Sequence, residues 1–311
     1  MVFRKATIVV LVLVLLVSAQ ASPLWAQGDD TPRIAIISAF EPELTMLLAQ
    51  TEVEETITRY GHTFTTGRLA GNDVVLFLSG VSMVNATLTT TMALENFNIT
   101  RIVFSGIAGG VSPELNIGDV AVPEQWGNYG KTFYARETEE GWNFGWHETP
   151  FGNYGMIVPQ TITVFNEAHP MPEGETTFWF PVDAEMYAVA QEVTADVELA
   201  ACTDEGVCLE QDPVLAFGGN GVSGPTFVDN AEYRQWVWDT FQAVALDMET
   251  AAVAIVAYTY DVPYLAFRSL SDLAGGGPGE NEIGTFFQLA ADNSASVVLD
   301  FLEGWAAHAA E

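Results

Sequence analysis

Three acidic residues, widely separated in the chain, each come shortly after a short apolar run: Glu43, Glu249 and Asp272. Carboxyl groups held in different surroundings can donate and accept protons, so three of them around one bond could carry acid–base chemistry. The plainer alternative is that these acids are solvated or simply begin helices, a role that suits Asp247 and Glu249.

The apolar runs belong to a longer series of predicted strands. Runs rich in Val, Ile and Phe alternate with segments of helical spacing, which is typical of a largely parallel sheet covered by helices on both faces. The predicted strands are residues 33–37, 73–78, 102–104, 118–122, 214–221, 243–246 and 263–267. The predicted helices are residues 83–96, 249–259 and 286–302. Ligands of such folds bind beyond the carboxyl ends of the strands, where the three acids are expected.

The sequence predicts a single α/β domain with a central, mostly parallel or mixed, twisted sheet and one long insertion. The insertion, about residues 124–213, is rich in Trp, Tyr, Gly and Pro, so we expect irregular or antiparallel structure there. A glycine-rich turn at residues 105–110 is expected after the strand at 102–104. A second glycine-rich stretch, residues 275–279, has no lysine after it, and we interpret it as a flexible segment that could close over a ligand.

The composition excludes several classes of partner. The chain has 311 residues, with 41 Asp and Glu against 10 Lys and Arg, which gives a formal charge of −31. Such a surface repels phosphate backbones and anionic lipids, so we expect no nucleic-acid partner and no membrane partner for the mature form. Solubility alone is the simpler explanation of the acidity. The 4 His residues lack ligand spacing, so we predict no metal and no other cofactor.

Two features of the sequence bear on the cellular location of the protein: its N-terminal segment and its two cysteines. Residues 1–26 hold two basic residues, a short apolar run and small residues, the pattern of a secretory signal peptide. We therefore expect export to the periplasm or the extracellular space, with an uncleaved anchor as the alternative. Cys202 and Cys208 then favour a local disulfide, because an oxidising compartment allows one. Metal binding is the weaker alternative, since no His or second Cys pair lies nearby.

Four motifs carry a family resemblance. The series S-A-F-E-P-E, S-G-I-A-G-G, D-M-E-T-A-A and R-S-L-S-D-L-A-G resembles the purine nucleoside phosphorylase and nucleosidase superfamily. Within it, the chain looks most like the methylthioadenosine/S-adenosylhomocysteine nucleosidases. The resemblance spans residues 33–305 and implies the nucleoside phosphorylase-like fold. The insertion and its flanks look instead like the secreted plant bark and vegetative storage proteins of the same superfamily.

The resemblance implies a role for each of the three acids. Asp272 matches the aspartate that donates a proton toward N7 of the leaving purine, which is needed because an anionic purine leaves poorly. Glu249 matches the glutamate that holds the ribose hydroxyls. Glu43 matches the glutamate that binds and activates the attacking water. The implied activity is hydrolysis of the N-glycosidic bond of a purine nucleoside of the methylthioadenosine/S-adenosylhomocysteine type.

The same matches suggest residues that bind the substrate. Met248 matches the methionine packed on the sugar, Arg268 the arginine near the water, and Phe227 the aromatic stacked on the base. The other candidate substrate-binding residues are Val228, Ser271, Ile107, Ala108 and Gly109. Ser271 is adjacent to the proposed acid and could orient it. Ile107 stands where the nucleosidases usually place a hydroxyl residue, and it matches the storage-protein branch better.

The attacking group separates a hydrolase from a phosphorylase. The loop at residues 38–43 offers carboxylates and no cation, and a phosphate there would face Glu43, so water is favoured. A phosphate-dependent purine nucleoside phosphorylase remains one alternative. A non-catalytic storage or nucleoside-binding protein is the other. The superfamily commonly forms dimers, trimers or hexamers, so we expect a homo-oligomer.

Overall fold

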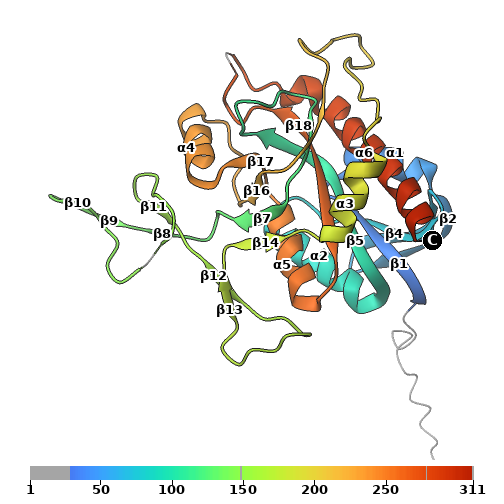
Figure 1. The fold of residues 1–311 in the computed structure, drawn as a ribbon, viewed down its shortest axis with the longest axis horizontal. Helices are drawn as coiled ribbons and strands as arrows, with labels where there is room; N and C mark the ends of the chain where they lie inside the picture. Colours follow the sequence, from blue (N-terminus) through green and yellow to red (C-terminus); the bar gives the residue numbers. More distant parts are fainter. Residues whose placement is uncertain (1–28, 148, 278, 310–311) are drawn as a thin grey trace, which may run out of the picture.

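The computed structural model describes residues 29–311 except 148, 278, 310 and 311 (Figure 1). The predicted signal peptide, residues 1–26, lies outside this described part. In the described part of the chain, twelve strands join one sheet. They are β1 (Asp29–Ser38), β2 (Glu52–Arg59), β3 (His62–Leu69), β4 (Asn72–Leu78), β5 (Phe97–Gly110), β6 (Val120–Val122), β7 (Gln125–Asn128), β14 (Trp179–Pro181), β15 (Leu215–Phe217), β16 (Asn220–Ser223), β17 (Ala243–Asp247) and β18 (Tyr264–Asp272).

The long strand β5 lies at the centre of this mixed sheet. It pairs in parallel with β1 and β18, and near its carboxyl end it pairs antiparallel with β17. The main path through the sheet is β14-β7-β16-β17-β5-β1-β4-β3-β2, while β18 also pairs with β6 and β6 with β15. Because most central pairs are parallel, the carboxyl ends of β1, β4, β5 and β18 meet at one edge of the sheet.

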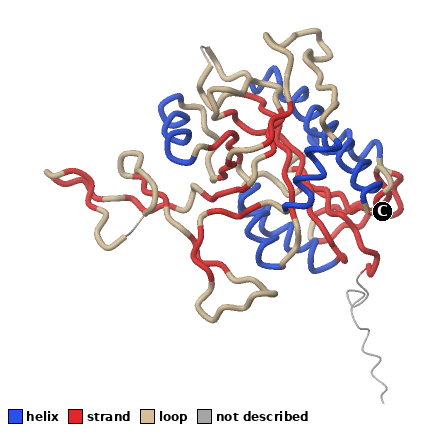
Figure 2. Tube along the Cα trace, viewed as in Figure 1, coloured by secondary structure: helices blue, strands red, loops and turns tan. Residues whose placement is uncertain are grey.

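Helices cover both faces of the sheet, as Figures 1 and 2 show. They are α1 (Glu41–Gln50), α2 (Met83–Asn96), α3 (Ala184–Val193), α4 (Ala231–Phe241), α5 (Thr250–Tyr260) and α6 (Ile283–His308). Helices α1 and α3 pack on α6, and α2 packs on α5. The predicted single α/β domain with a mixed sheet flanked by helices is therefore confirmed. No helix in the described part of the chain is both long and apolar enough to cross a membrane.

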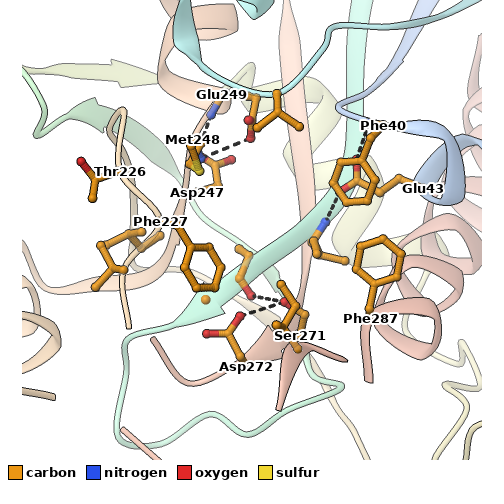
Figure 3. Close-up of a pocket in the computed structure, with 17 residues that line it drawn as sticks. Phe40, Glu43, Thr226, Phe227, Asp247, Met248, Glu249, Ser271, Asp272 and Phe287 are labelled. Carbon is orange, nitrogen blue, oxygen red and sulfur yellow. Dashed lines mark hydrogen bonds between the residues drawn. The ribbon is translucent and has the colours of Figure 1, made fainter. Parts of the chain in front are cut away.

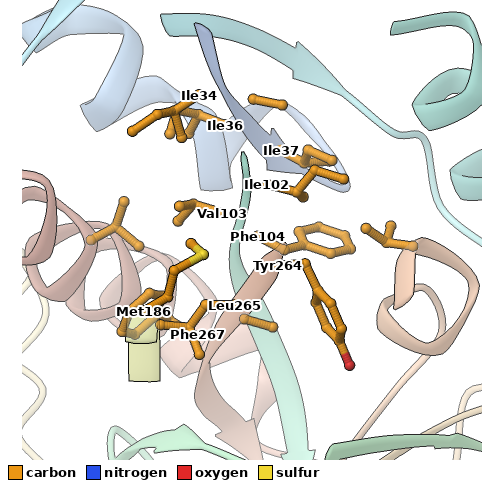
Figure 4. Packing of buried hydrophobic residues seen from close by; sticks show 14 of the residues in the cluster. Ile34, Ile36, Ile37, Ile102, Val103, Phe104, Met186, Tyr264, Leu265 and Phe267 are labelled. Atoms are coloured by element: carbon orange, nitrogen blue, oxygen red, sulfur yellow. The ribbon is translucent and has the colours of Figure 1, made fainter. Parts of the chain in front are cut away.

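The hydrophobic core lies between the central strands and the helices. Ile36 and Ile37 of β1, Val103 and Phe104 of β5, and Phe267 of β18 are fully buried there (Figure 4). Burying each such side chain contributes about 1.5–3 kcal/mol relative to leaving it exposed. This packing fixes the strands whose ends carry the acids.

The region at residues 124–213 contains most of the irregular structure. Three two-stranded antiparallel sheets occur in it, and Figure 1 shows them extending away from the main sheet. They pair β8 (Thr132–Tyr134) with β11 (Ile157–Pro159), β9 (Arg136–Thr138) with β10 (Gly141–Asn143), and β12 (Ile162–Val164) with β13 (Glu175–Thr177). Strands β7 and β14 and helix α3, from the same region, pack with the main domain instead.

Two expectations about strand ends are wrong. The glycine-rich segment at residues 105–110 is not a turn, because β5 continues through it to Gly110 and pairs with both β17 and β18. Strand β18 likewise continues from the expected end at residue 267 to Asp272, so the R-S-L-S-D motif is itself strand. In both cases long-range pairing extends the strand beyond the apolar run that signals it.

Other boundaries differ for local reasons. The expected strand at 214–221 is two strands, β15 and β16, because Gly218 and Gly219 have φ values of +109° and +73° and turn the chain between them. The hairpin of β2 and β3 was not among the predicted strands. Strand β2 has the sequence EVEETITR and is almost wholly exposed, so it lacks the apolar alternation by which strands are recognised.

Candidate active site

A pocket of about 160 Å³ opens at the carboxyl ends of the central strands (Figure 3). Loops after β1 and β4, the second half of β5, the loop before α4, the ends of β17 and β18, and the start of α6 all contribute to it. It is lined by Phe40, Glu43, Val81, Ile107, Ala108, Gly109, Thr226, Phe227, Val228, Leu246, Asp247, Met248, Glu249, Ser271, Asp272, Ile283 and Phe287. The three acids of the sequence analysis therefore share one cavity.

Glu43 lies on the first turn of α1 and is 1% exposed. Its Oε1 accepts a hydrogen bond from the N–H of Ile107 at 2.7 Å, and its Oε2 accepts from those of Ala39 and Phe40 at 2.7 and 3.3 Å. Burial raises the pKa of Glu43 to about 7, against the opposing effects of Arg268 and of the three N–H groups. A carboxyl that titrates near neutral pH is suited to accept a proton from water.

Glu249 is the residue before α5 and lies beside Met248 and Asp247 at the pocket (Figure 3). Its Oε1 accepts from the N–H of Ser82 at 2.8 Å, and its Oε2 accepts from that of Met248 at 3.2 Å. Ser82 has a φ of +92°, a strained value for a residue with a side chain, and strain of this kind clusters at functional sites. The remaining lone pairs of the Glu249 carboxyl are available to a ligand in the pocket.

The neighbouring charges also act on the pKa of Glu249. Burial and the neighbouring carboxyl of Asp247 raise the pKa of Glu249, Arg268 lowers it, and the like charge of Glu43 raises it further. Carboxyl groups influence each other in this way only within a short distance in a poorly solvated site.

Asp272 ends β18 at the floor of the pocket and is 2% exposed. Its Oδ1 accepts from the N–H of Ala274 at 2.8 Å, and its Oδ2 accepts from the hydroxyl of Ser271 at 3.0 Å. Burial raises the pKa of Asp272 above its ordinary value, although these bonds oppose the rise. A carboxyl with a raised pKa keeps its proton to higher pH, as a general acid requires.

Arg268 is not among the residues that line the pocket, but it contacts one of them, Asp247. Its guanidinium is fully buried, forms an ion pair with Asp247 at 2.9 Å, and donates two hydrogen bonds to the hydroxyl of Thr250 at 2.7 and 3.0 Å. It also lies 3.9 Å from the centre of the Phe104 ring. Arg268 was expected near the attacking water; in the structure it pairs with Asp247, and its charge also lowers the pKa of Glu43, so its role toward substrate stays a prediction.

The remaining wall of the pocket is apolar. The rings of Phe40 and Phe287 stack with their centres 5.0 Å apart, and Ile283 and Val81 lie at the same cavity. Phe227 is 52% exposed and stands at the mouth of the pocket. A ligand here would have its polar groups at the acids and an uncharged part against these side chains.

Most of the predicted substrate-binding residues come together in the structure. Those lining the pocket are Met248, Phe227, Val228, Ser271, Ile107, Ala108 and Gly109. Their roles stay predictions. The sequence analysis missed Phe40, Val81, Ile283 and Phe287. Phe40 and Val81 follow β1 and β4, so inspecting every strand end would have found them, but the α6 residues are brought in only by tertiary packing.

Cys202 and Cys208 form the predicted disulfide, which closes a loop with a sequence separation of 6. The loop lies outside the pocket of the three acids, and Cys208 borders a different cavity together with Leu209 and Phe286. The disulfide is therefore part of the scaffold and not of the candidate site.

The fold is that of a known class of protein. The family model of the phosphorylase superfamily matches residues 33–303, and the chain belongs to that superfamily. Among curated proteins, the chain is 29% identical over 275 residues to the 5′-methylthioadenosine/S-adenosylhomocysteine nucleosidase of Bacillus thuringiensis (strain Al Hakam), covering 87% of this chain and 98% of the relative.

Solved structures agree on the fold. The chain is similar to futalosine hydrolase of Helicobacter pylori, with a TM-score of 0.64, 24% identity, and coverage of 88% of this chain and 97% of the other. It is equally similar to the 5′-methylthioadenosine/S-adenosylhomocysteine nucleosidase of Neisseria meningitidis in complex with methylthio-immucillin-A, with a TM-score of 0.64, 24% identity, and coverage of 87% and 98%.

Proposed function

We propose that the protein is a nucleosidase that hydrolyses the N-glycosidic bond of a purine nucleoside. The observation that carries the proposal is the convergence of Glu43, Glu249 and Asp272 on one pocket whose remaining wall is apolar. The relatives named as nucleosidases support a glycosidic hydrolase. The purine itself and the roles of the three acids are part of this proposal.

Each of the three acids has one role in the proposed reaction. Asp272 gives its proton to N7 of the purine as the C1′–N9 bond breaks, so that the bond's electron pair leaves on a neutral base. Glu249 accepts hydrogen bonds from the ribose hydroxyls and steadies the positive charge that develops on the sugar ring. Water attacks C1′, and Glu43 takes the proton that the water loses.

The described pocket lining favours water over phosphate as the attacking group. It holds the carboxylates of Glu43, Asp247 and Glu249 and no Lys or Arg. Arg268 is fully buried and outside the lining, where its Nε and Nη2 bond to Thr250 and Asp247. Its Nη1 has no hydrogen-bond partner in the described part of the chain. An inorganic phosphate would therefore meet like charge without a cation from the lining to offset it.

The apolar wall suggests the nature of the 5′ substituent. Phe40, Phe287, Ile283 and Val81 offer contact area but no charge to a group attached at the 5′ position. A small uncharged substituent, such as the methylthio group of methylthioadenosine, would be favoured. A zwitterionic or carboxylate-bearing substituent would lose solvation there without gaining a partner from this wall.

The test is product analysis by NMR with methylthioadenosine, S-adenosylhomocysteine, adenosine and inosine, each in the presence of phosphate. We expect free purine and free sugar, with the methylthio substrate turned over best. Formation of the sugar 1-phosphate would show a phosphorylase instead. Binding of the nucleosides without any product would show a storage or binding protein.

We also propose that the chain is exported, with residues 1–26 as the signal peptide. The oxidised pair Cys202 and Cys208 supports this, because disulfides persist in oxidising compartments. Mass spectrometry of the protein recovered from expressing cells should give a mature N-terminus after Ala21 or Ala26. Recovery of the full-length chain inside the cytoplasm would refute export.

A homo-oligomer is proposed as the working form. Val84 and Leu88 are one turn apart on α2 and are 78% and 51% exposed, and Val81, 46% exposed, lies next to them at the pocket. Apolar side chains grouped in this way are typical of a contact surface. Light scattering should give a multiple of the monomer mass for the wild type and monomers for Val84→Glu. A monomeric wild type would refute the proposal.

A further inference from the structure

Asn281 lies between β18 and α6 and connects the proposed general acid to a second carboxylate. Its Nδ2 donates to Asp272 Oδ1 at 3.2 Å and to Asp229 Oδ1 at 3.1 Å. Its Oδ1 accepts from the N–H of Ile283 at 3.0 Å, at the first turn of α6. The amide is thus held at both ends, with its nitrogen toward the two acids and its oxygen toward the helix.

These contacts make the two oxygens of Asp272 unequal. Oδ1 accepts from Asn281 and from the N–H of Ala274, whereas Oδ2, among the described residues, accepts only from the hydroxyl of Ser271. An oxygen that already faces two N–H donors is a poor place for a proton, because the proton would point at them. The hydroxyl of Ser271 also lies 3.4 Å from the carbonyl of Ala108, so it can turn there when Oδ2 carries the proton.

We infer that Asn281 is a positioning residue that places the proton of Asp272 on Oδ2 and sets how firmly it is held by keeping the Asp229 carboxylate alongside. The inference rests on the proposed function and adds to it a determinant outside the four family motifs. Asp229 precedes α4 and is exposed, while Asn281 comes from the segment before α6. The protonation of Asp272 therefore depends on the position of the segment before α6 relative to the pocket.

The charges around Asp272 are consistent with this role. Burial is the main cause of its raised pKa, the bonds from Ala274, Ser271 and Asn281 lower the pKa, and the charge of Asp229 raises it. On the other packed elements, Arg234 of α4 donates to the carbonyls of Gly110 and Ser112, and the carboxyl of Glu282 lies beside Gly277. Glu43 and Glu249 line the same pocket.

Two variants and one control test the inference. Asp229→Asn keeps the shape and removes the charge, and Asn281→Leu keeps the approximate size and removes the donor. Asp239→Asn, an exposed aspartate at the end of α4, is the charge-matched control. The readouts are the pH dependence of kcat with methylthioadenosine and a carboxyl-carbon NMR titration of Asp272, whose signal is assigned by its loss in Asp272→Asn.

Asp229→Asn should lower the pH at which Asp272 loses its proton by a few tenths of a unit, and added salt should shrink the difference because Asp229 is exposed. Asn281→Leu should raise that pH and lower kcat by roughly two- to tenfold, with KM nearly unchanged. The control should match the wild type in both readouts.

Unchanged titrations in both variants would overturn the inference, as would an equal shift in Asp239→Asn. The proposed function fails separately. If the wild type releases no purine, the hydrolase assignment is lost, while the NMR titration still reports whether Asn281 and Asp229 govern the Asp272 proton.

Discussion

Arg268 and Asp247 form a buried ion pair at the candidate active site, with Nη2 and Oδ2 2.9 Å apart, and Asp247 also lines the pocket. Asp247 is also bonded by the hydroxyls of Ser223 and Thr250 and by the N–H of Thr250. The pair thus holds the start of α5, where Glu249 is placed, and the charge of Arg268 lowers the pKa of both Glu43 and Glu249. One buried cation thus supports a pocket whose ionisable lining residues are all acids.

Replacing Arg268 by Met should destabilise the protein strongly. It leaves Asp247 buried without its charge partner, a change that typically costs about 3–5 kcal/mol in unfolding free energy. Urea denaturation at pH 7 measures the loss. The control is Arg68→Met, because Arg68 is 53% exposed and its contact with Asp73 is 3.8 Å long; we expect a loss below about 1 kcal/mol there. Equal losses in both variants would argue against a structural role for the buried pair.

Glu43 should make activity and stability respond to pH in opposite directions. Water activation needs the carboxylate, so kcat should fall as the pH drops through about 7, the pKa of this residue. Folding favours the protonated form of Glu43. The contribution of this form to the free energy of unfolding is complete below pH 4.5, the ordinary pKa, and is lost as the pH rises through about 7.

The variant Glu43→Gln isolates the stability effect. Between pH 5 and pH 8, the unfolding free energy of the wild type relative to this variant should fall by roughly 3 kcal/mol, because only the wild type ionises at the site. Thermal or urea unfolding at several pH values measures it. Parallel pH curves for the two proteins would mean that the carboxyl of Glu43 does not titrate in this range.

Replacing Glu249 by Gln should weaken catalysis without unfolding the chain. The side chain keeps its size, but hydrogen bonds from the ribose hydroxyls to a carboxylate, worth about 1.5–3 kcal/mol, become bonds to a neutral amide. We expect kcat/KM to fall by about 10- to 100-fold with a 2′- or 3′-hydroxylated substrate, and by much less with a substrate that lacks the contacted hydroxyl. Equal losses on both substrates would contradict the ribose assignment.

Removing the disulfide should affect stability alone. The double variant Cys202→Ser, Cys208→Ser opens a short loop, and loop-closure entropy for a ring of this size is worth roughly 2 kcal/mol. The cysteines lie outside the pocket, so the rate of purine release should stay at the wild-type value. Denaturant unfolding and the release assay, run on the same preparation, check both parts; a large loss of kcat would connect the loop to the site.

The sequence indicated that the three acids lie at one edge of the sheet because their signals are local. Glu43, Glu249 and Asp272 each follow an apolar run within a few residues, and the layered α/β fold brings such positions to one edge. The same rule places Met248 and Ser271 correctly at the pocket, since they are chain neighbours of these acids.

The rest depended on contacts that are distant in the chain. Gly106 looks like part of a turn, but in the structure it lets β5 pass beside the acids: an added Cβ would lie 2.1 Å from Arg268 Nη1 and 2.6 Å from Glu43 Oε1. Phe287 reaches the pocket because α6 packs on α1. Arg268 pairs with Asp247 and does not line the pocket, a tertiary contact that sequence order does not reveal.

The most direct measurement is purine release from methylthioadenosine in phosphate-free buffer by the wild type, Asp272→Asn and the exposed control Asp239→Asn. We predict saturable release by the wild type and the control, no acceleration on adding phosphate, and a loss of about 10²- to 10⁴-fold in Asp272→Asn. Release that requires phosphate, or that survives in Asp272→Asn, would contradict hydrolysis by these three acids.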